Sequence, residues 1–502
     1  MSSTPFDEMY TPSGEVRPHY QDFSRWLEMQ SSEKLQNKRA EADLIFRRVG
    51  ITFAVYGEES GTERLIPFDI VPRVIKASEW KTLEAGLRQR VQALNMFLKD
   101  IYNEQKILGT GLIPPEQIFN NEQYRPEMQG VKVAGDIYAH IAGVDVVRAG
   151  EGEFYVLEDN LRVPSGVSYM LENRKMMMRL FPELFARNRV APVEHYPDNL
   201  LENLRSVSPQ NSSDPTVVLL TPGMYNSAYF EHAFLAQQMG IELVEGKDMF
   251  VDEEVLYMRT TQGPKRVDVI YRRVDDDFLD PTVFRKDSML GVPGIVNAYR
   301  KGNVNLANAL GTGVLEARAM MAFLPKIAQV LLGEPLKMPN IATWWCGQQA
   351  ERAYVEANAA RMMIGRALDY DLPFAMGAET AMGHITPAAP DHAALVGQEA
   401  VTLSTTPVWH EGHLVPRPMT VRVFAARTES GWTFMPGIWM RWPPEMMTRS
   451  VGFKPERITR RPSTRGPVCT ACGVVVPSAL TTMTTRRAAS VAMAESGTSR
   501  AS

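Results

Sequence analysis

The chain has 502 residues, of which 44% are hydrophobic and 22% charged, so it is long enough for about two to four domains and a sizeable core. Its three cysteines are too few for a disulfide framework, and a net charge of −4 gives no reason to expect nucleic acid as the main partner. The charge is uneven, because residues 438–502 carry ten basic and three acidic side chains, a net +7, which leaves −11 on the remainder.

No segment has the features of a targeting signal or a membrane span. Residues 1–10 lack a basic region followed by an apolar run. The most apolar helical stretch, residues 319–332, is short and contains Pro325 and Lys326. We therefore expect a cytoplasmic protein that has no membrane partner.

The first 160 residues predict a polar helical start, a long helix and a group of strands. Residues 1–50 are polar and predict helix after Tyr20, and two short apolar runs in residues 51–75 predict strands. From Leu83 to Ile101, apolar side chains recur at steps of three and four, which predicts one face of a long amphipathic helix. Residues 131–160 contain short runs of β-branched and aromatic residues, which predict further strands.

Residues 216–275 alternate between strand and helix signals. Strands are predicted at 216–220, 241–246 and 267–273, and a helix is predicted from Asn226 to Met239, which indicates a mixed α/β region. Another helix is predicted from Val314 to Leu332, and three strands are predicted at 397–404, 418–426 and 431–437. The polar stretch from Asn203 to Pro215 has the composition of a linker.

Residues 143–160 have the pattern of a β-hairpin that carries two carboxylates. Turn residues at 149–152 separate two apolar runs. If the turn is centred between Glu151 and Gly152, Asp145 lies directly opposite Glu158. Asn160 is two residues further along the strand and so lies on the same face as Glu158.

Two opposed carboxylates repel each other unless the face is fully hydrated or a cation lies between them. Two carboxylates and an amide oxygen are hard ligands that suit Mg²⁺ when it also binds substrate phosphates. The alternative is a solvated hairpin whose acidic residues have no common role. A turn shifted by one residue would also move Asp145 to the other face, so spacing alone leaves both interpretations open.

The hairpin, followed by Arg162 and the turn Pro164 to Gly166, resembles the magnesium-binding strand pair of ATP-grasp ligases. Longer stretches are similar to the circularly permuted ATP-grasp type 2 family, related to glutathionylspermidine synthase-like ligases; they include residues 6–20, 154–174, 219–246, 267–281 and 287–314. The resemblance implies an α+β (mixed α/β) protein, built as a circularly permuted ATP-grasp with a preATP-grasp-like α/β substrate domain.

The same resemblance divides the chain into four parts. Residues 1–202 would form the N-terminal part of the permuted ATP-grasp with its metal-binding hairpin, and residues 216–312 the α/β substrate-side domain. Residues 313–437 would supply a helix and the ATP-side strands. Residues 438–502, a basic tail rich in Ser, Thr and Arg, have the composition of a disordered segment. Because the family pattern stops after Gly437, we interpret this tail as an out-of-frame or recombined C-terminus.

The resemblance also implies ATP and Mg²⁺ as cofactors and assigns roles to individual residues. Asp145, Glu158 and Asn160 would bind Mg²⁺. Gln398 and Glu399 would face the adenine edge, and the following strand would carry Arg417 and Arg422 for phosphate contacts. Arg162 and Arg422 are the candidate catalytic residues. The candidate substrate-binding residues are Ser165, Gly166, Arg272 and Arg273, with the acidic run 275–277 at the end of the same strand.

The implied function is an ATP- and Mg²⁺-dependent carboxylate–amine ligase that forms an amide or peptide bond through an acyl phosphate. Its partners would be small-molecule or peptide carboxylates and amines. Two features depart from the family. No lysine and no glycine-rich run lies between Ile364 and Gln398, where Arg366 stands near the place of the ATP-binding lysine, and the family pattern stops after Gly437. A catalytically impaired relative that binds nucleotide or a partner protein is therefore the alternative. A third hypothesis is that the basic tail contacts nucleic acid or an anionic surface.

Overall fold

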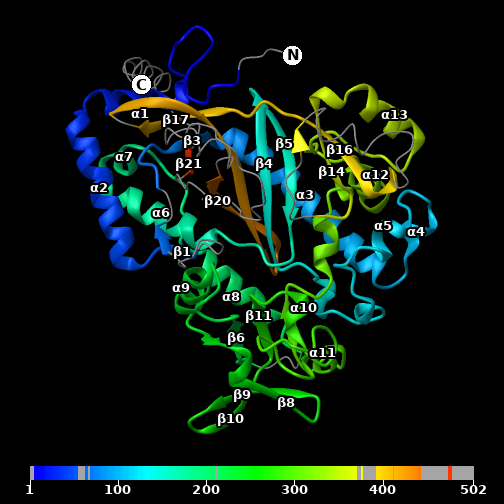
Figure 1. Ribbon diagram of the computed structural model, residues 1–502. Coiled ribbons are helices and arrows are strands. Elements are labelled where there is room, and N and C mark those ends of the chain that lie inside the picture. The colour runs from blue at the N-terminus through cyan, green and yellow to red at the C-terminus, as the bar shows by residue number, and fades with distance from the viewer. Residues whose placement is uncertain are drawn as a thin grey trace, which may run out of the picture.

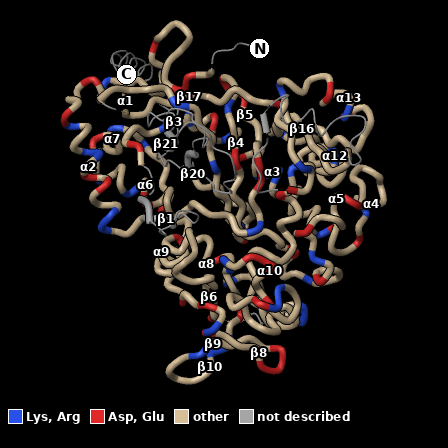
Figure 2. Tube along the Cα trace, viewed as in Figure 1, with Lys and Arg blue, Asp and Glu red and all other residues tan. Residues whose placement is uncertain are grey.

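A computed structural model of the chain describes residues 5–54, 63–65, 68–209, 213–369, 375–376, 392–410, 412–441 and 473–476. Within these ranges, no helix combines the length and the apolar character needed to cross a membrane. Acidic and basic residues are interspersed along the described trace (Figure 2). The predicted mixture of helices and strands is confirmed.

A four-stranded antiparallel sheet lies at the centre of the molecule (Figure 1). Its order is β20-β19-β4-β5, so it combines the hairpin β4 (Ile141–Gly150) and β5 (Glu153–Asn160) with β19 (Thr420–Thr428) and β20 (Gly431–Arg441). Side chains alternate along β19: Val423 enters one large hydrophobic cluster and Phe424 the other. The central sheet is therefore covered on both faces.

Helices from the N-terminal half surround this sheet. The predicted long helix is confirmed as α3 (Ala77–Ile101), which buries Leu83, Leu87, Val91, Leu94 and Leu98 along one face. On the other side lie η1 (Pro18–Tyr20), α1 (Gln21–Glu28), α2 (Ser32–Val49), α6 (Val167–Leu180) and α7 (Pro182–Arg187) (Figure 1).

A parallel sheet of order β12-β11-β6-β7 forms the predicted α/β region, at the bottom of Figure 1. Its strands are β6 (Val217–Leu220), β7 (Glu242–Val244), β11 (Val269–Arg272) and β12 (Asn305–Ala307). Its helices are α8 (Tyr196–Ser206), α9 (Tyr229–Met239), α10 (Asp276–Leu279) and α11 (Ile295–Arg300). From β6 the chain continues to β7 on one side of the sheet, and from β11 it continues to β12 on the other side. In open α/β sheets, the point where the direction of connection reverses is where a ligand crevice lies, at the carboxyl ends of the strands.

Two details of this region differ from the sequence expectations. Helix α8 continues through Ser206, so Asn203 is a buried helical residue rather than the start of a linker. A protruding antiparallel sheet is inserted before β11, with strands β8 (Met249–Asp252), β9 (Val255–Thr260) and β10 (Gly263–Arg266).

A third sheet, of order β13-β16-β14-β15, lies at the right of Figure 1. It consists of β13 (Thr343–Trp345), β14 (Met362–Arg366), β15 (Ala375–Met376) and β16 (Leu395–Glu399). Helices α12 (Met320–Leu332) and α13 (Gln349–Ala357) lie nearby. The single helix predicted from Val314 divides into η5 (Thr312–Glu316) and α12, because Ala317 between them is extended.

The remaining elements are short. Strands β17 (Thr405–His410) and β18 (His413–Pro418) form a hairpin, β1 (Thr52–Ala54) pairs with β2 (Glu63–Leu65), and β3 (Arg73–Lys76) pairs in parallel with β21 (Gly473–Val476). The other short helices are α4 (Lys106–Gly109), α5 (Glu116–Phe119), η2 (Pro126–Met128), η3 (Ala134–Asp136), η4 (Gly246–Asp248), η6 (Ala359–Arg361) and η7 (His392–Ala394).

The predicted tail lies largely outside the described residues. Its first residues belong to β20, which continues to Arg441, and residues 473–476 form β21. Strand β20 therefore extends a few residues beyond Gly437.

Candidate active site at the open end of the hairpin

Three charged residues form a row across the central sheet. Asp145 on β4 is the register partner of Glu158 on β5, as the position of the turn predicts, and of Arg422 on β19. The Arg422 guanidinium donates from Nε to Asp145 Oδ1 at 2.6 Å and from Nη2 to Asp145 Oδ2 at 2.8 Å. Nη2 also lies 3.2 Å from Glu158 Oε1. The two opposed carboxylates thus share one cationic side chain, which offsets the repulsion between them.

The three members of this row differ in exposure. The side chains of Asp145 and Arg422 are 1% and 5% exposed, whereas that of Glu158 is 46% exposed. Burial disfavours the charged guanidinium, but the neighbouring carboxylates of Asp145 and Glu158 outweigh it and raise the pKa of Arg422 above its ordinary value. The Asp145–Arg422 pair is therefore a fixed buried ion pair, and Glu158 is the carboxylate that faces outward.

Glu158 and Asn160 supply the accessible oxygen donors of the hairpin. The Asn160 amide donates from Nδ2 to Glu158 Oε1 at 3.3 Å, which leaves its own oxygen as a further acceptor. These all-oxygen donors fit Mg²⁺. Both oxygens of the buried Asp145 accept from Arg422. No group of three His, Cys, Asp or Glu side chains suited to a metal occurs in the part of the chain that the structure describes.

A second buried ion pair fixes β5 on its opposite face. Arg90 of α3 donates from Nη2 to Asp159 Oδ2 at 2.6 Å and from Nε to Asp159 Oδ1 at 2.8 Å. Arg90 Nη1 also donates to Asn340 Oδ1 at 2.6 Å. Because side chains alternate along a strand, anchoring Asp159 inward holds Glu158 and Asn160 outward.

Beyond Asn160 the chain forms a connector, residues 161–168, which leads into α6. Asn308, which follows β12, donates to the Leu161 carbonyl at 2.5 Å. Arg422 Nη1 donates to the Ser165 carbonyl at 3.3 Å. Gly166 lies in the left-handed region at a φ of 116°, and its N–H donates to Glu231 Oε2 at 2.8 Å. The predicted substrate residues Ser165 and Gly166 therefore lie beside the charged row.

Arg272 and Arg273, at the end of β11, are both buried. Arg273 donates to the Pro164 carbonyl at 2.6 Å and to Glu231 Oε1 at 3.1 Å. Arg272 forms an ion pair with Asp276, whose Oδ1 lies 2.6 Å from Nη1. The partners of these two guanidinium groups all lie within the protein. Arg273 therefore holds the connector in place, and Arg272 holds the residues that follow the sheet.

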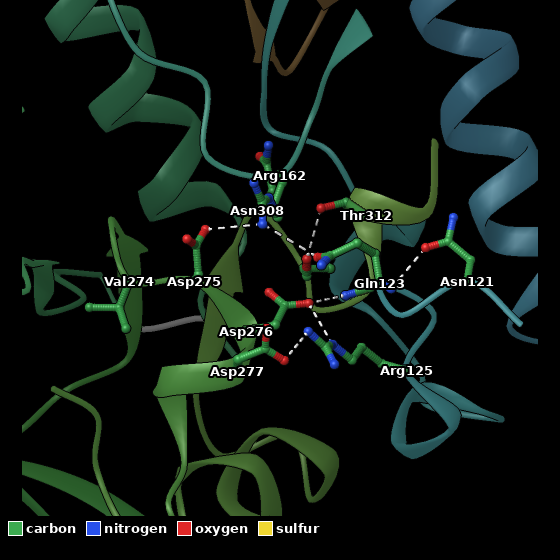
Figure 3. Close-up of polar contacts among 12 residues, drawn as sticks. Asn121, Gln123, Arg125, Arg162, Val274, Asp275, Asp276, Asp277, Asn308 and Thr312 are labelled. Carbon is green, nitrogen blue, oxygen red and sulfur yellow. Dashed lines mark hydrogen bonds and ion pairs between the residues drawn. The ribbon is translucent and has the colours of Figure 1, made fainter. Parts of the chain in front are cut away.

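Arg162 lies where the connector meets the carboxyl edge of the parallel sheet (Figure 3). Its Nη1 is 3.7 Å from Asp275 Oδ1 and 3.5 Å from Gln123 Oε1, and its Nε is 3.6 Å from Glu316 Oε2. These contacts are longer than good hydrogen bonds, and the Arg162 side chain is 13% exposed. Arg162 is thus a mostly buried cation that lies beside the side chains of Asp275, Gln123 and Glu316.

The acidic run 275–277 consists of residues with different environments (Figure 3). Asp276 is fully buried between Arg272 and Arg125. Burial alone would raise the pKa of the Asp276 carboxyl, but these two guanidinium groups lower it below its ordinary value. Asp277 pairs with Arg125 at 2.7 Å between Oδ1 and Nη2, and Asp275 and Asp277 are each 44% exposed. In this run, therefore, Asp276 stabilises the fold through its buried ion pairs, and Asp275 and Asp277 lie at the surface.

The predicted adenine-facing residues lie on β16, in a different sheet from the hairpin. Gln398 is buried, and its Nε2 donates to Thr343 Oγ1 on β13 at 3.1 Å. Glu399 N donates to the Ala342 carbonyl at 2.9 Å. Just before β13, the Ile341 N–H donates to the Val156 carbonyl on β5 at 3.0 Å. Residues 339–342 thus join the two sheets, and Glu158 and Gln398 lie on strands that flank this junction.

The prediction that Arg417 and Arg422 share a strand is wrong. Arg417 lies on β18, opposite Thr406 of β17, in a separate two-stranded sheet. Pro418 has no N–H with which to extend the ladder, and a new strand, β19, begins at Thr420. Arg366, at the end of β14, has a side chain that is 71% exposed, and its nearest described ionic contact is Asp369 Oδ2 at 3.9 Å.

Three polar residues of the site were not predicted: Glu231, Asn308 and Glu316. Each is separated from the connector by at least 60 residues of sequence. No local pattern marks these residues, because their partners are backbone groups of a distant segment. The sequence offers one weak signal of such a contact, which is a charged residue flanked by apolar residues in a predicted helix. Glu231, in the helix predicted at 226–239, is an example.

Comparisons with known proteins identify the family. Residues 72–442 match the family model described as circularly permuted ATP-grasp type 2. An uncharacterized protein of Synechocystis sp. is 46% identical over 359 residues, which cover 72% of this chain and 75% of that protein. An uncharacterized protein of Mycobacterium tuberculosis is 42% identical over 440 residues, covering 86% of this chain and 79% of that protein.

A candidate glutamate–cysteine ligase of Frankia alni is 35% identical over 432 residues, which cover 84% of this chain but only 49% of that protein. Among solved structures, a glutathione synthetase-like effector of Globodera pallida superimposes with a TM-score of 0.55 at 10% identity, covering 82% of this chain and 96% of that chain. That likeness concerns the fold. The family match covers well over half of the residues, so this chain belongs to the circularly permuted ATP-grasp type 2 family.

Proposed function

We propose that this protein is an ATP- and Mg²⁺-dependent carboxylate–amine ligase. The observation that carries the proposal is the row Arg422–Asp145–Glu158 with Asn160 beside it. This row lies at the open end of a hairpin that meets the carboxyl edge of a parallel sheet (Figure 1). A carboxylate substrate would attack the γ-phosphate of ATP and release ADP, and an amine would then displace phosphate from the acyl phosphate to form an amide.

In this proposal the protein positions reactants and neutralises charge on oxygen. Glu158 and Asn160 would hold Mg²⁺, whose chemistry is to neutralise phosphate oxygens and polarise the phosphoryl group. Arg162 presents a guanidinium group suited to phosphate or carboxylate oxygens, and Arg422, fixed in its buried pair with Asp145, contributes positive charge beside Glu158. Gln398, Glu399 and Arg417 would belong to the nucleotide side.

The substrate-side residues divide into two kinds. Ser165 is half-buried on the connector and is the residue that we assign to substrate contact. The Gly166 N–H is already donated to Glu231, so we assign Gly166 a conformational role that its φ of 116° demands. Arg272 and Arg273 are buried with internal partners, and we assign them no direct contact with substrate.

The test is binding of ATP in the presence of Mg²⁺, measured by calorimetry on the wild type and on two variants. Glu158→Ala removes the exposed carboxylate of the row. Glu153→Ala removes an exposed carboxylate at the other end of the same strand and is the matched control. We expect at least a tenfold loss of affinity for Glu158→Ala and no change for Glu153→Ala.

Absence of ATP binding to the wild type would contradict the ligase proposal. Equal binding by all three proteins would contradict the metal assignment only. ATP binding without phosphate release, in the presence of glutamate and other small carboxylates with amines, would favour the second candidate function.

That second candidate is a relative that binds nucleotide without turnover. It is supported by β14, which presents Arg366 and contains no lysine. A planar guanidinium does not replace a compact ammonium at a phosphate. The prediction is that Arg366→Lys increases phosphate release if the site is a weakened ligase and leaves it at zero if catalysis is absent.

A further inference from the structure

Side chains from distant parts of the sequence hold the backbone of the connector, residues 161–168. Their targets include the N–H groups of residues 161, 162, 166 and 168 and the carbonyl groups of residues 161, 164 and 165. The side chains belong to Glu316, Glu231, Asn308, Arg273 and Arg422. Residues 161–166, the part of the connector that precedes α6, are thus held by long-range polar contacts rather than by a strand or helix of their own.

Glu316 holds the end of this connector that is next to the proposed metal ligand. Its Oε1 accepts from Leu161 N at 2.9 Å and from Arg162 N at 2.8 Å. Its Oε2 lies 3.6 Å from Arg162 Nε, and its side chain is 12% exposed. Glu316 therefore binds the two residues that directly follow Asn160.

These contacts fix the direction in which the chain leaves β5. If Leu161 and Arg162 lost their acceptor, the last residue of the strand could rotate, and the Asn160 amide would leave the face that it shares with Glu158. The orientation of Arg162 toward Asp275 and Gln123 would change with it (Figure 3). Substitution of a residue that orients a metal ligand without binding the metal itself typically lowers metal affinity by roughly 10- to 100-fold.

We propose that Glu316 is a positioning residue for the proposed ligase, and that its carboxylate oxygen sets the geometry of Asn160 and Arg162 by accepting two backbone hydrogen bonds. The proposal rests on the assignment of Glu158 and Asn160 as metal ligands. It predicts that the acceptor oxygen matters more than the negative charge. Glutamine, which keeps that oxygen, should therefore replace glutamate at this position far better than alanine does.

The experiment measures Mn²⁺ affinity by electron paramagnetic resonance on the full chain, with amide hydrogen exchange at residues 160–168 as the second readout. We expect Glu316→Ala to weaken Mn²⁺ binding by at least tenfold and to accelerate exchange at Leu161 and Arg162. We expect Glu316→Gln to remain within about threefold of the wild type and to keep both amides protected.

Asp280→Asn is the matched control, because Asp280 is also a buried carboxylate that accepts backbone hydrogen bonds, from Thr282, Gly294 and Val296. It should destabilise the fold without changing Mn²⁺ affinity. A wild type that binds no Mn²⁺ would overturn the metal assignment itself. Mn²⁺ binding by the wild type that is unchanged in Glu316→Ala, or reduced as much in Glu316→Gln as in Glu316→Ala, would overturn the positioning role alone.

Discussion

The Arg422 guanidinium contacts two carboxylates, those of Asp145 and Glu158, and Phe424, two residues further along the same strand, belongs to a large hydrophobic cluster. Removing a partner from a buried ion pair leaves an uncompensated charge, which costs far more than the pair itself contributes. At this position the uncompensated charge would be Asp145, whose side chain is 1% exposed. The identity of residue 422 therefore affects both folding and the proposed chemistry.

We expect Arg422→Met to lower the free energy of unfolding by about 3–5 kcal/mol at neutral pH, as measured by urea denaturation. Arg417→Met is the control, since Arg417 is only half-buried on β18 and its loss should change stability by about 0.5 kcal/mol or less. In Arg422→Met, Asp145 becomes available as a cation ligand. Addition of Mg²⁺ should therefore raise the free energy of unfolding of this variant by more than it raises that of the wild type. Equal losses in the two variants would contradict a buried ion pair at Arg422.

His140 gives the fold a pH dependence with a definite sign. The ring is fully buried and Nδ1 lies 3.0 Å from Asn203 Nδ2, while Nε2 has no hydrogen-bond partner among the described residues. Burial lowers the pKa of His140 from 6.5 to about 4. The neutral form is favoured in the folded protein, so its contribution to stability is complete above pH 6.5 and decreases as the pH falls toward 4.

The predicted loss from His140 over this interval is about 3 kcal/mol, because each pH unit between the two pKa values contributes about 1.4 kcal/mol. In His140→Gln the free energy of unfolding, measured by urea denaturation between pH 7 and pH 4.5, should fall less steeply with acidification than in the wild type. The same substitution at the exposed His413 should leave the slope unchanged. Identical slopes in His140→Gln and the wild type would exclude this titration.

At the scale of elements, the loops at the carboxyl edge of the parallel sheet pack backbone against backbone. A Cβ atom on Gly291 would lie 2.0 Å from the Leu279 carbonyl oxygen and 2.3 Å from that of Phe278. No flexible side chain is available to move there. This close approach holds the long loop after α10 against the backbone of α10, the helix that directly follows Asp275, the residue that meets Arg162.

Gly291→Ala should therefore destabilise the protein by about 3 kcal/mol or more, as measured by chemical denaturation. Gly109→Ala in α4 is the control, because a Cβ at Gly109 would meet nothing within 4 Å and its φ is ordinary. Alanine there should be neutral or stabilising by up to about 1 kcal/mol. A neutral Gly291→Ala would show that the loop can move away from α10.

The hairpin shows which parts of the site local sequence can predict. The turn at Glu151 and Gly152 predicts the pairing of Asp145 with Glu158, and the structure has that pairing because two register shifts, between Arg148 and Gly150 and between Asp145 and Val146, cancel. The partner of both carboxylates, Arg422, is 277 residues from Asp145. No spacing rule connects them, because only assembly of the central sheet brings β19 beside β4.

The connector illustrates the opposite case, because neither hydrophobic periodicity nor turn residues in the sequence predict its contacts. Glu316 was expected within a helix from Val314 to Leu332, but it ends a 3-10 turn and binds the backbone of Leu161 and Arg162. Hydrophobic periodicity reports which face of an element is buried. It contains no information about a carboxylate that accepts hydrogen bonds from a distant loop.

At the scale of the whole molecule, Asn308 joins the central sheet to the parallel sheet. Its Oδ1 accepts from His140 N at 2.7 Å and Ile141 N at 3.0 Å, and its Nδ2 donates to the Ile141 carbonyl at 2.7 Å and the Leu161 carbonyl at 2.5 Å. These backbone groups lie at the start of β4 and just after the end of β5, at the open end of the hairpin. Asn308 itself follows β12, so one amide joins the proposed metal hairpin to the substrate-side sheet.

Asn308→Ala would leave four buried backbone groups without partners, each costing about 1–3 kcal/mol. We expect the free energy of unfolding to fall by at least about 4 kcal/mol, with faster amide exchange at Ile141. Asn305→Ala on the adjoining strand is the control, because Asn305 is equally buried but its Nδ2 has no hydrogen-bond partner among the described residues. Its loss should be clearly smaller. If both variants lost the same stability, the junction would depend on apolar packing between the sheets, and substrate-side movements would not be transmitted to the hairpin through this amide.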